Sequence, residues 1–125
     1  MNLNSNDKLI VEVSGTKYVF NFQKVHSKPT TKLGRIAEKI NQNGNDLETE
    51  VTFDRPAIVF EAIHSYYQTG ILHIPTNICP IAFKQELEFW EIEPCELTGC
   101  CLCKYISALD EFETTKKNKS KNNKI

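Results

Sequence analysis

The stretch His73-Ile74-Pro75-Thr76-Asn77-Ile78-Cys79, followed after twenty residues by the adjacent pair Cys100-Cys101, is the most informative part of this chain. One imidazole and three thiols make up the ligand complement of a closed tetrahedral zinc site. The residues around Ile74 and Pro75 are expected to be extended, and six extended steps span roughly 20 Å. Unless this segment folds back, His73 and Cys79 cannot hold the same ion within one chain. The spacing therefore predicts a metal site that a neighbouring copy completes with its own Cys79.

Each candidate ligand also has a plainer interpretation. Alone, His73 is typical of a partly exposed strand residue and Cys79 of a small buried hydrophobe, but the joint spacing with Cys100-Cys101 favours zinc. A competing redox set is the C-x-x-C formed by Cys100 and Cys103, with Cys95 upstream. Such a site needs a strand-to-helix context, whereas this pair is expected within a helix. Cys95 and Cys103 are interpreted as free thiols, one of which would substitute if the ion were bound within one chain.

Four further segments share a family pattern with the zinc-ligand spacing. They are Thr31-Lys32-Leu33-Gly34-Arg35, Thr52-Phe53-Asp54-Arg55, Ile63-His64-Ser65-Tyr66-Tyr67-Gln68-Thr69-Gly70 and Gln85-Glu86-Leu87-Glu88-Phe89-Trp90-Glu91-Ile92. With H-x5-C-x20-C-C, they resemble the tetramerisation domain at the cytoplasmic N-terminus of voltage-gated potassium channels, in its zinc-containing, Shaw-like form. The resemblance covers roughly residues 8 to 113.

The resemblance implies a fold, a site and partners. The fold is an α+β, BTB/POZ-like layered domain that assembles as a fourfold ring. His73, Cys100 and Cys101 of one subunit and Cys79 of its neighbour are expected to bind zinc. The expected partners are further copies of this chain (a homotetramer) or closely related channel subunits, with channel auxiliary subunits as additional candidates. The expected location is the cytoplasmic side of the plasma membrane, reached only through the parent channel.

Length and composition indicate one intracellular domain. The chain has 125 residues, of which 40% are hydrophobic, which is enough for one modest core. It shows no apolar run near the roughly 20 residues of a membrane span and no signal peptide, so it is expected to be soluble and not secreted. Five cysteines without a signal peptide favour reduced thiols over disulfides. The expected organisation is a flexible N-terminus (1–7), the domain (8–113) and a disordered lysine-rich tail (114–125).

The charge distribution is uneven. Five of the 15 Lys and Arg residues lie in the last ten positions, which leaves 10 basic against 16 acidic groups in residues 1–115. An acidic body repels phosphates, so nucleic acid is not an expected partner. The tail is interpreted as a solvated linker, with attraction to anionic lipid, worth about 1 kcal/mol per lysine, as the alternative.

Hydrophobic periodicity predicts mixed short strands and helices. A hairpin is expected from Leu9–Val13 and Tyr18–Phe22, a helix over 31–41 and a strand at Val51–Phe53. A helix from Pro56, capped by Asp54, is expected to stop at Gly70, and two more helices are expected from Pro80 and near Glu96. This order gives the α+β class.

The sequence gives no support for catalysis. It contains no Gly-rich phosphate loop, no nucleophile elbow and no Cys/His pair with a third orienting group. Glu86, Glu88, Glu91 and Glu93 follow the expected polar face of a helix, and His26 and His64 are expected in solvent.

We therefore predict a non-enzymatic tetramerisation domain that directs assembly of a voltage-gated potassium channel through interfacial zinc, and that does not conduct ions by itself. The alternative is a free-standing BTB-type adaptor that scaffolds a partner such as a ubiquitin ligase. A third interpretation, a small enzyme or redox protein, rests only on the cysteine cluster.

Overall fold

The computed structural model describes residues 7–43 and 48–122. Its elements are β1 (Lys8–Val13), β2 (Thr16–Asn21), α1 (Phe22–His26), α2 (Lys32–Asn43), β3 (Glu48–Phe53), α3 (Ala57–Thr69), α4 (Pro80–Trp90), a short 3-10 helix η1 (Pro94–Glu96) and α5 (Gly99–Asn122). The α+β class predicted from the sequence is confirmed. α1 was not predicted; it begins where β2 ends, because the Asn21 side chain accepts a hydrogen bond from the Lys24 amide at 3.2 Å and caps it.

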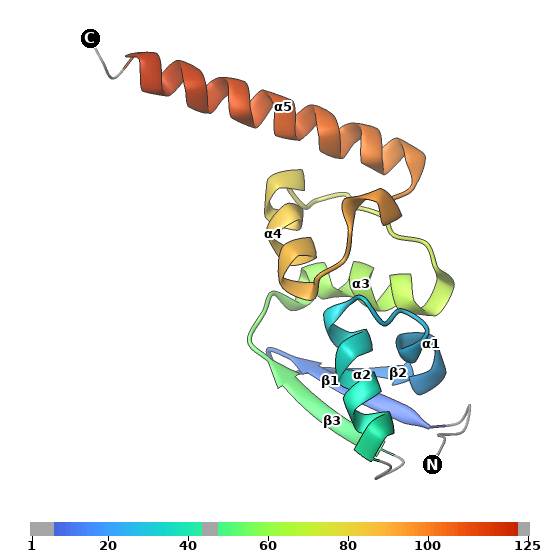
Figure 1. Cartoon of the computed structure of the whole chain (residues 1–125). Helices are drawn as coiled ribbons and strands as arrows, with labels where there is room; N and C mark the ends of the chain where they lie inside the picture. Colours follow the sequence, from blue (N-terminus) through green and yellow to red (C-terminus); the bar gives the residue numbers. More distant parts are fainter. Residues whose placement is uncertain (1–6, 44–47, 123–125) are drawn as a thin grey trace.

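The elements are layered along one direction (Figure 1). The sheet, in the order β2-β1-β3, lies at one end with α1 and α2 beside it. α3 lies next to the sheet, α4 follows, and α5 crosses the end of the domain farthest from the sheet. The C-terminal half of α5 extends away from the other elements. The segments before α4 and before α5 therefore both lie away from the sheet.

The hairpin and the parallel strand pair place one sheet face in the core. β1 pairs antiparallel with β2 through a two-residue turn in which Ser14 and Gly15 have φ of 49° and 90°. Positive φ at both central positions is the mark of a type I′ hairpin turn. β3 joins β1 in parallel, with Val11 opposite Val51. The inward face of β1 carries Leu9, Val11 and Val13, all fully buried.

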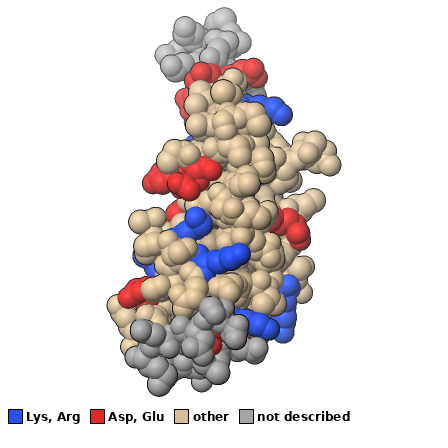
Figure 2. Space-filling view, turned by 90° about the vertical axis from the view of Figure 1, so that its right-hand side faces the viewer, with Lys and Arg blue, Asp and Glu red and all other residues tan. Residues whose placement is uncertain are grey.

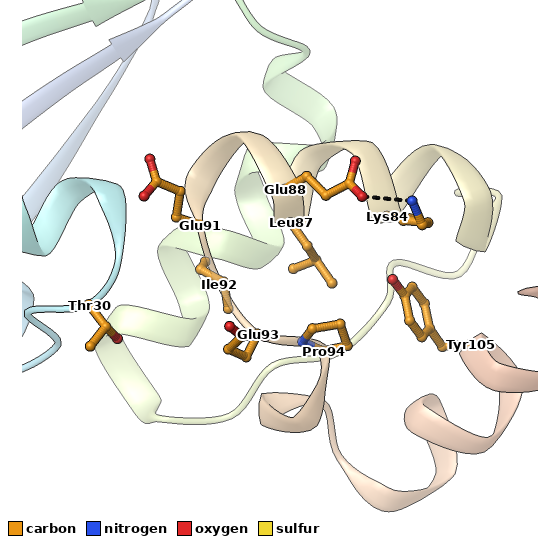
Figure 3. Close-up of a pocket in the computed structure, with 9 residues that line it drawn as sticks. All are labelled: Thr30, Lys84, Leu87, Glu88, Glu91, Ile92, Glu93, Pro94 and Tyr105. Atoms are coloured by element: carbon orange, nitrogen blue, oxygen red, sulfur yellow. Dashed lines mark hydrogen bonds and ion pairs between the residues drawn. The ribbon is translucent and has the colours of Figure 1, made fainter.

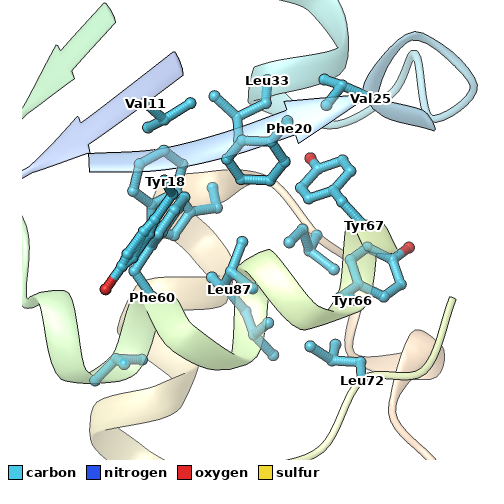
Figure 4. Close-up of a cluster of buried hydrophobic side chains, with 14 of the residues drawn as sticks. Val11, Tyr18, Phe20, Val25, Leu33, Phe60, Tyr66, Tyr67, Leu72 and Leu87 are labelled. Atoms are coloured by element: carbon cyan, nitrogen blue, oxygen red, sulfur yellow. The ribbon is translucent and has the colours of Figure 1, made fainter. Parts of the chain in front are cut away.

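The core is built around aromatic side chains from the hairpin, α3 and α4 (Figure 4). Phe20 contacts the Phe60 and Tyr67 rings edge-on, with centroids 5.9 and 5.5 Å away, and Trp90 packs 4.7 Å from Phe60. The Tyr67 hydroxyl donates a 2.6 Å hydrogen bond to Thr31 Oγ1. This satisfies a buried polar group, and it ties α3 to the loop before α2.

Several helix boundaries follow the sequence, and one does not. α3 ends at Gly70, which has φ of 80°, and α4 begins at Pro80, both as predicted. The prediction that Asp54 caps α3 was wrong, because Pro56 is the capping residue and makes no side-chain cap hydrogen bond. Asp54 lies two residues before the position from which a side chain can reach the first free amides.

Three groups expected in solvent are held by partners instead. Glu86 is buried and bonds to Arg55 at 2.5 Å. His64 is half-buried, with Nε2 3.0 Å from the Val19 carbonyl oxygen, and His26 lies 2.6 Å from Glu38. Periodicity alone could not show that other elements cover these helix faces.

The two ends of the chain are described only in part. Where a disordered tail (114–125) was expected, α5 continues to Asn122, and residues 123–125 lie outside the described part. Lysine is a good helix former, and cations are favourable near a helix C-terminus. In the expected flexible segment 1–7, residues 1–6 are not described. Asp7 is buried, and its carbonyl accepts a 2.9 Å hydrogen bond from the Phe22 amide.

Gly34 gives a test of the packing at the start of α2. A Cβ built there would lie 1.8 Å from the carbonyl oxygen of Lys28, a backbone atom that cannot rotate away. We expect Gly34→Ala to lower the free energy of unfolding by about 3 kcal/mol, the upper end of ordinary overpacking. Urea unfolding followed by circular dichroism measures it. Gly99→Ala, which meets no atom within 4 Å, is the matched control and should be neutral or slightly stabilising.

Candidate metal site

A short backbone pairing brings two distant segments together. Leu72 and Leu97 form a parallel bridge, and the Thr98 amide donates a 3.0 Å hydrogen bond to the Leu72 carbonyl oxygen. Both leucines are buried, so the pairing is anchored in the core. The residues that follow each leucine, His73 on one segment and Thr98 on the other, are thereby placed side by side at the start of α5.

His73 and Cys101 meet at this point. Cys101 Sγ lies 3.7 Å from His73 Nδ1, and it accepts a hydrogen bond from the Ile74 amide at 3.4 Å. Cys101 is buried, whereas His73 is exposed.

The surroundings of Cys101 favour its thiolate. The Thr98 hydroxyl is the largest influence, and with the Ile74 amide and His73 it lowers the pKa of the Cys101 thiol to about 7, against the opposing effect of burial. Since thiolates and not thiols bind metals, the site is electrostatically suited to a cation near neutral pH.

The spacing of these two groups fits a shared tetrahedral zinc ion. With Zn–S near 2.3 Å and Zn–N near 2.0 Å, tetrahedral ligands keep sulfur and nitrogen about 3.5 Å apart. The 3.7 Å between Cys101 Sγ and His73 Nδ1 matches that separation. Cys100 is exposed, and its Sγ lies 3.9 Å from Thr98 Oγ1, which itself is 3.3 Å from His73 Nδ1. The chemistry of the donor set therefore fits zinc.

One chain does not complete such a site by itself. Among the residues whose side chains the structure describes (7–42 and 50–113), no group of three or more His, Cys, Asp or Glu is arranged to hold a metal ion. Cys100 thus does not converge with His73 and Cys101 in the single chain.

Cys79 lies apart, directly before α4. It is exposed and precedes Pro80, the first residue of that helix. The extended conformation expected between His73 and Cys79 was wrong in part, because the Ile78 amide bonds to the Pro75 carbonyl at 3.1 Å and closes a turn. Pro75 and Asn77 are residues that favour turns. The plain expectation that Cys79 is a buried hydrophobe is also wrong.

The two remaining cysteines, Cys95 and Cys103, are those interpreted from the sequence as free thiols. Both are exposed, Cys95 in η1 and Cys103 within α5, and among the described residues no disulfide joins any of the five cysteines. Cys103 is the fifth residue of α5, whereas Cys100, the other cysteine of the C-x-x-C, lies in the first turn of that helix.

One hollow of the surface is lined by carboxylates that are paired with cations (Figure 3). It has a volume of about 520 Å³ and lies between α4, the start of α5 and Thr30. Two of its carboxylates are engaged: Glu88 pairs with Lys84 at 2.7 Å, and Glu91 accepts a 2.6 Å hydrogen bond from Arg35. The hollow does not strengthen an enzymatic interpretation.

The surface is mixed in charge where Figure 2 shows it, with basic and acidic side chains interspersed over that face. Of the helices in the described ranges, none is both long enough and apolar enough to cross a membrane.

Thr98 is the residue at this site that the sequence interpretation missed. Its hydroxyl is near both His73 and Cys100. A weak signal was present, since threonine is favoured at the capping position of a helix, and the helix expected near Glu96 begins instead at Gly99, directly after Thr98. Nothing in the linear spacing placed it against His73, twenty-five residues away.

Comparison with known proteins supports the resemblance. A sequence model of the BTB/POZ domain matches residues 9–100. "Potassium voltage-gated channel subfamily V member 1" of Rattus norvegicus is 28% identical over 126 residues, which cover 86% of this chain and 25% of that protein. "Voltage-gated potassium channel KCNC1" of Mus musculus is 31% identical over 110 residues, covering 86% of this chain and 22% of that protein.

The chain spans about a quarter of the length of the curated relatives it matches. The family match extends from β1 to the start of α5 and so includes the sheet, α1 to α4 and His73, Cys79 and Cys100. The predicted family is confirmed: the chain belongs to the BTB/POZ domain family and is homologous to voltage-gated potassium channel subunits over most of its length.

Proposed function

We propose that this chain is the cytoplasmic tetramerisation domain of a voltage-gated potassium channel subunit, and that zinc bound between neighbouring subunits holds the assembly together. The observation that carries the proposal is the 3.7 Å approach of His73 Nδ1 to Cys101 Sγ, with Cys100 adjacent in sequence. Membership of the BTB/POZ family and homology to channel subunits support it.

The exposure of the remaining ligands supports sharing between chains. Cys79 and Cys100 are exposed in the single chain, although cysteine is among the most buried residue types in folded proteins. A neighbouring subunit that brings its Cys79 to His73, Cys100 and Cys101 would cover both thiols. The four donors would then form the closed tetrahedral set of a structural zinc site.

The physical role of the ion is to couple metal binding to the association of subunits. A ligand that binds only the assembled form stabilises it by its binding free energy, and subunits with polar surfaces can remain separate without it. Partners would be further copies of this chain or closely related channel subunits, with auxiliary subunits as additional candidates. In this function the domain selects and joins subunits on the cytoplasmic side of the membrane, and ion conduction belongs to other parts of the channel.

The direct test is the mass of the full chain in solution, measured by light scattering together with zinc content, before and after a strong chelator. We expect a species four times the 14.3 kDa chain mass, with about one zinc per subunit, that dissociates when the metal is removed. The same chelator saturated with zinc is the control and should change nothing. A dimer whose mass does not change when the chelator is added would contradict the proposal and favour the adaptor alternative.

A further inference from the structure

The backbone of Thr98 is anchored by two hydrogen bonds. Its amide donates to the Leu72 carbonyl at 3.0 Å, and its own carbonyl accepts a 2.7 Å hydrogen bond from the Leu102 amide in the first turn of α5. A β-branched side chain on a fixed backbone has few accessible rotamers. The hydroxyl of Thr98 is therefore a fixed point at the start of the helix.

This fixed hydroxyl is within reach of two candidate ligands. Thr98 Oγ1 lies 3.3 Å from His73 Nδ1 and 3.9 Å from Cys100 Sγ. The imidazole is exposed, so no packing from the described part of the chain surrounds it on all sides and fixes its orientation. Among the described residues, the His73 ring has hydrogen-bond contacts with Thr98 Oγ1 and with Cys101 Sγ.

We infer that Thr98 is the positioning residue of the proposed zinc site. In the metal-free chain its hydroxyl donates a hydrogen bond to His73 Nδ1, which keeps that nitrogen unprotonated beside Cys101. When a metal ion takes the lone pair of Nδ1, the hydroxyl is released to donate to the Cys100 sulfur. The inference rests on the proposed function, because it assigns Thr98 a role toward ligands whose metal is itself proposed. Residues that orient ligands in this way commonly contribute 10- to 100-fold to metal affinity.

The test compares Thr98→Val, which keeps the branched shape and removes the hydroxyl, with Thr98→Ser, which keeps the hydroxyl. Zinc affinity of the full chain is measured by competition with a chromophoric chelator. We expect Thr98→Val to bind zinc roughly 10- to 100-fold more weakly and Thr98→Ser to stay within about threefold of the wild type. Thr30→Val, at an exposed threonine of the loop before α2, is the matched control and should bind as the wild type does.

A second readout does not depend on metal. The ¹⁵N shifts of the His73 ring in metal-free chain report its tautomer, and we expect Thr98→Val to mix the two tautomers while Thr98→Ser retains the wild-type signal. Should the valine variant fail to fold, Thr98→Ala is compared with Thr98→Ser in the same two assays. Wild-type zinc affinity or wild-type His73 shifts in the variant without the hydroxyl would overturn the inference. Absence of zinc binding by the wild type would instead overturn the proposed function, with the His73 shifts still deciding the role of Thr98.

Discussion

Cys79→Ser and Cys101→Ser chains, purified separately, are each expected to lose zinc and tetrameric assembly, and to regain part of both when mixed. A neutral serine hydroxyl does not replace a thiolate in a structural zinc site. If ligands are shared, a Cys79→Ser subunit still offers His73, Cys100 and Cys101, and a Cys101→Ser subunit still offers Cys79. A junction therefore has all four ligands when the Cys79→Ser subunit supplies His73, Cys100 and Cys101 and the Cys101→Ser subunit supplies Cys79.

The expected recovery can be calculated from the ring. Random mixing completes about a quarter of the junctions and strict alternation about half, so we expect zinc between these fractions of the wild-type content. Zinc analysis after gel filtration, with light scattering of the same fractions, measures it. Cys95→Ser and Cys103→Ser are matched controls, since both residues are exposed cysteines outside the proposed ligand set, and should assemble normally. A Cys79→Ser chain that alone keeps full zinc and tetrameric mass would show that the ion is not shared.

Arg55→Met is expected to destabilise the domain by about 3–5 kcal/mol, because it would leave a buried carboxylate without its charge partner. Arg55 Nη2 lies 2.5 Å from Glu86 Oε2, and the Glu86 side chain is only 6% exposed. The Trp90 indole also donates to Glu86 at 3.3 Å, so the carboxylate is part of the contact between α4 and the loop after β3. Chemical unfolding of metal-free chain gives the free-energy change.

A double variant separates the buried charge from the lost packing. Arg55→Met combined with Glu86→Leu is expected to recover most of the loss, since replacing both members of a buried pair by apolar residues is often neutral. The matched control is Lys84→Met, which breaks the 2.7 Å pair with Glu88 at the surface and should cost under about 1 kcal/mol. If Arg55→Met costs no more than Lys84→Met, the Arg55–Glu86 pair is not important for stability.

Much of the fold could be predicted from local pattern. The alternation of apolar and polar residues in β1 and β2 predicted the hairpin. Gly70 and Pro80 marked helix boundaries, because these depend on the backbone preferences of the residue itself. α1 and the cap of α3 were missed, since a five-residue helix is too short for periodicity, and Pro56 took the capping position expected of Asp54.

The candidate site, too, was predicted from the sequence only in part. The sequence spacing identified four candidate ligands: His73, Cys79, Cys100 and Cys101. The structure shows the contact between His73 and Cys101. The turn between Pro75 and Ile78, and the position of Thr98 beside His73, depend on pairings between distant segments. Whether Cys79 of a neighbour completes the set stays a prediction for the experiments above.

From the order of its residues alone, this chain's family, its α+β class and its candidate ligands could be inferred, because residue identity and periodicity carry that information. Only the three-dimensional packing revealed that the Leu72–Leu97 bridge brings His73 to Cys101 and Thr98, and that Glu86 is buried against Arg55. The reason is physical: burial and side-chain encounters are created by contacts between segments far apart in the chain, and no local pattern encodes them.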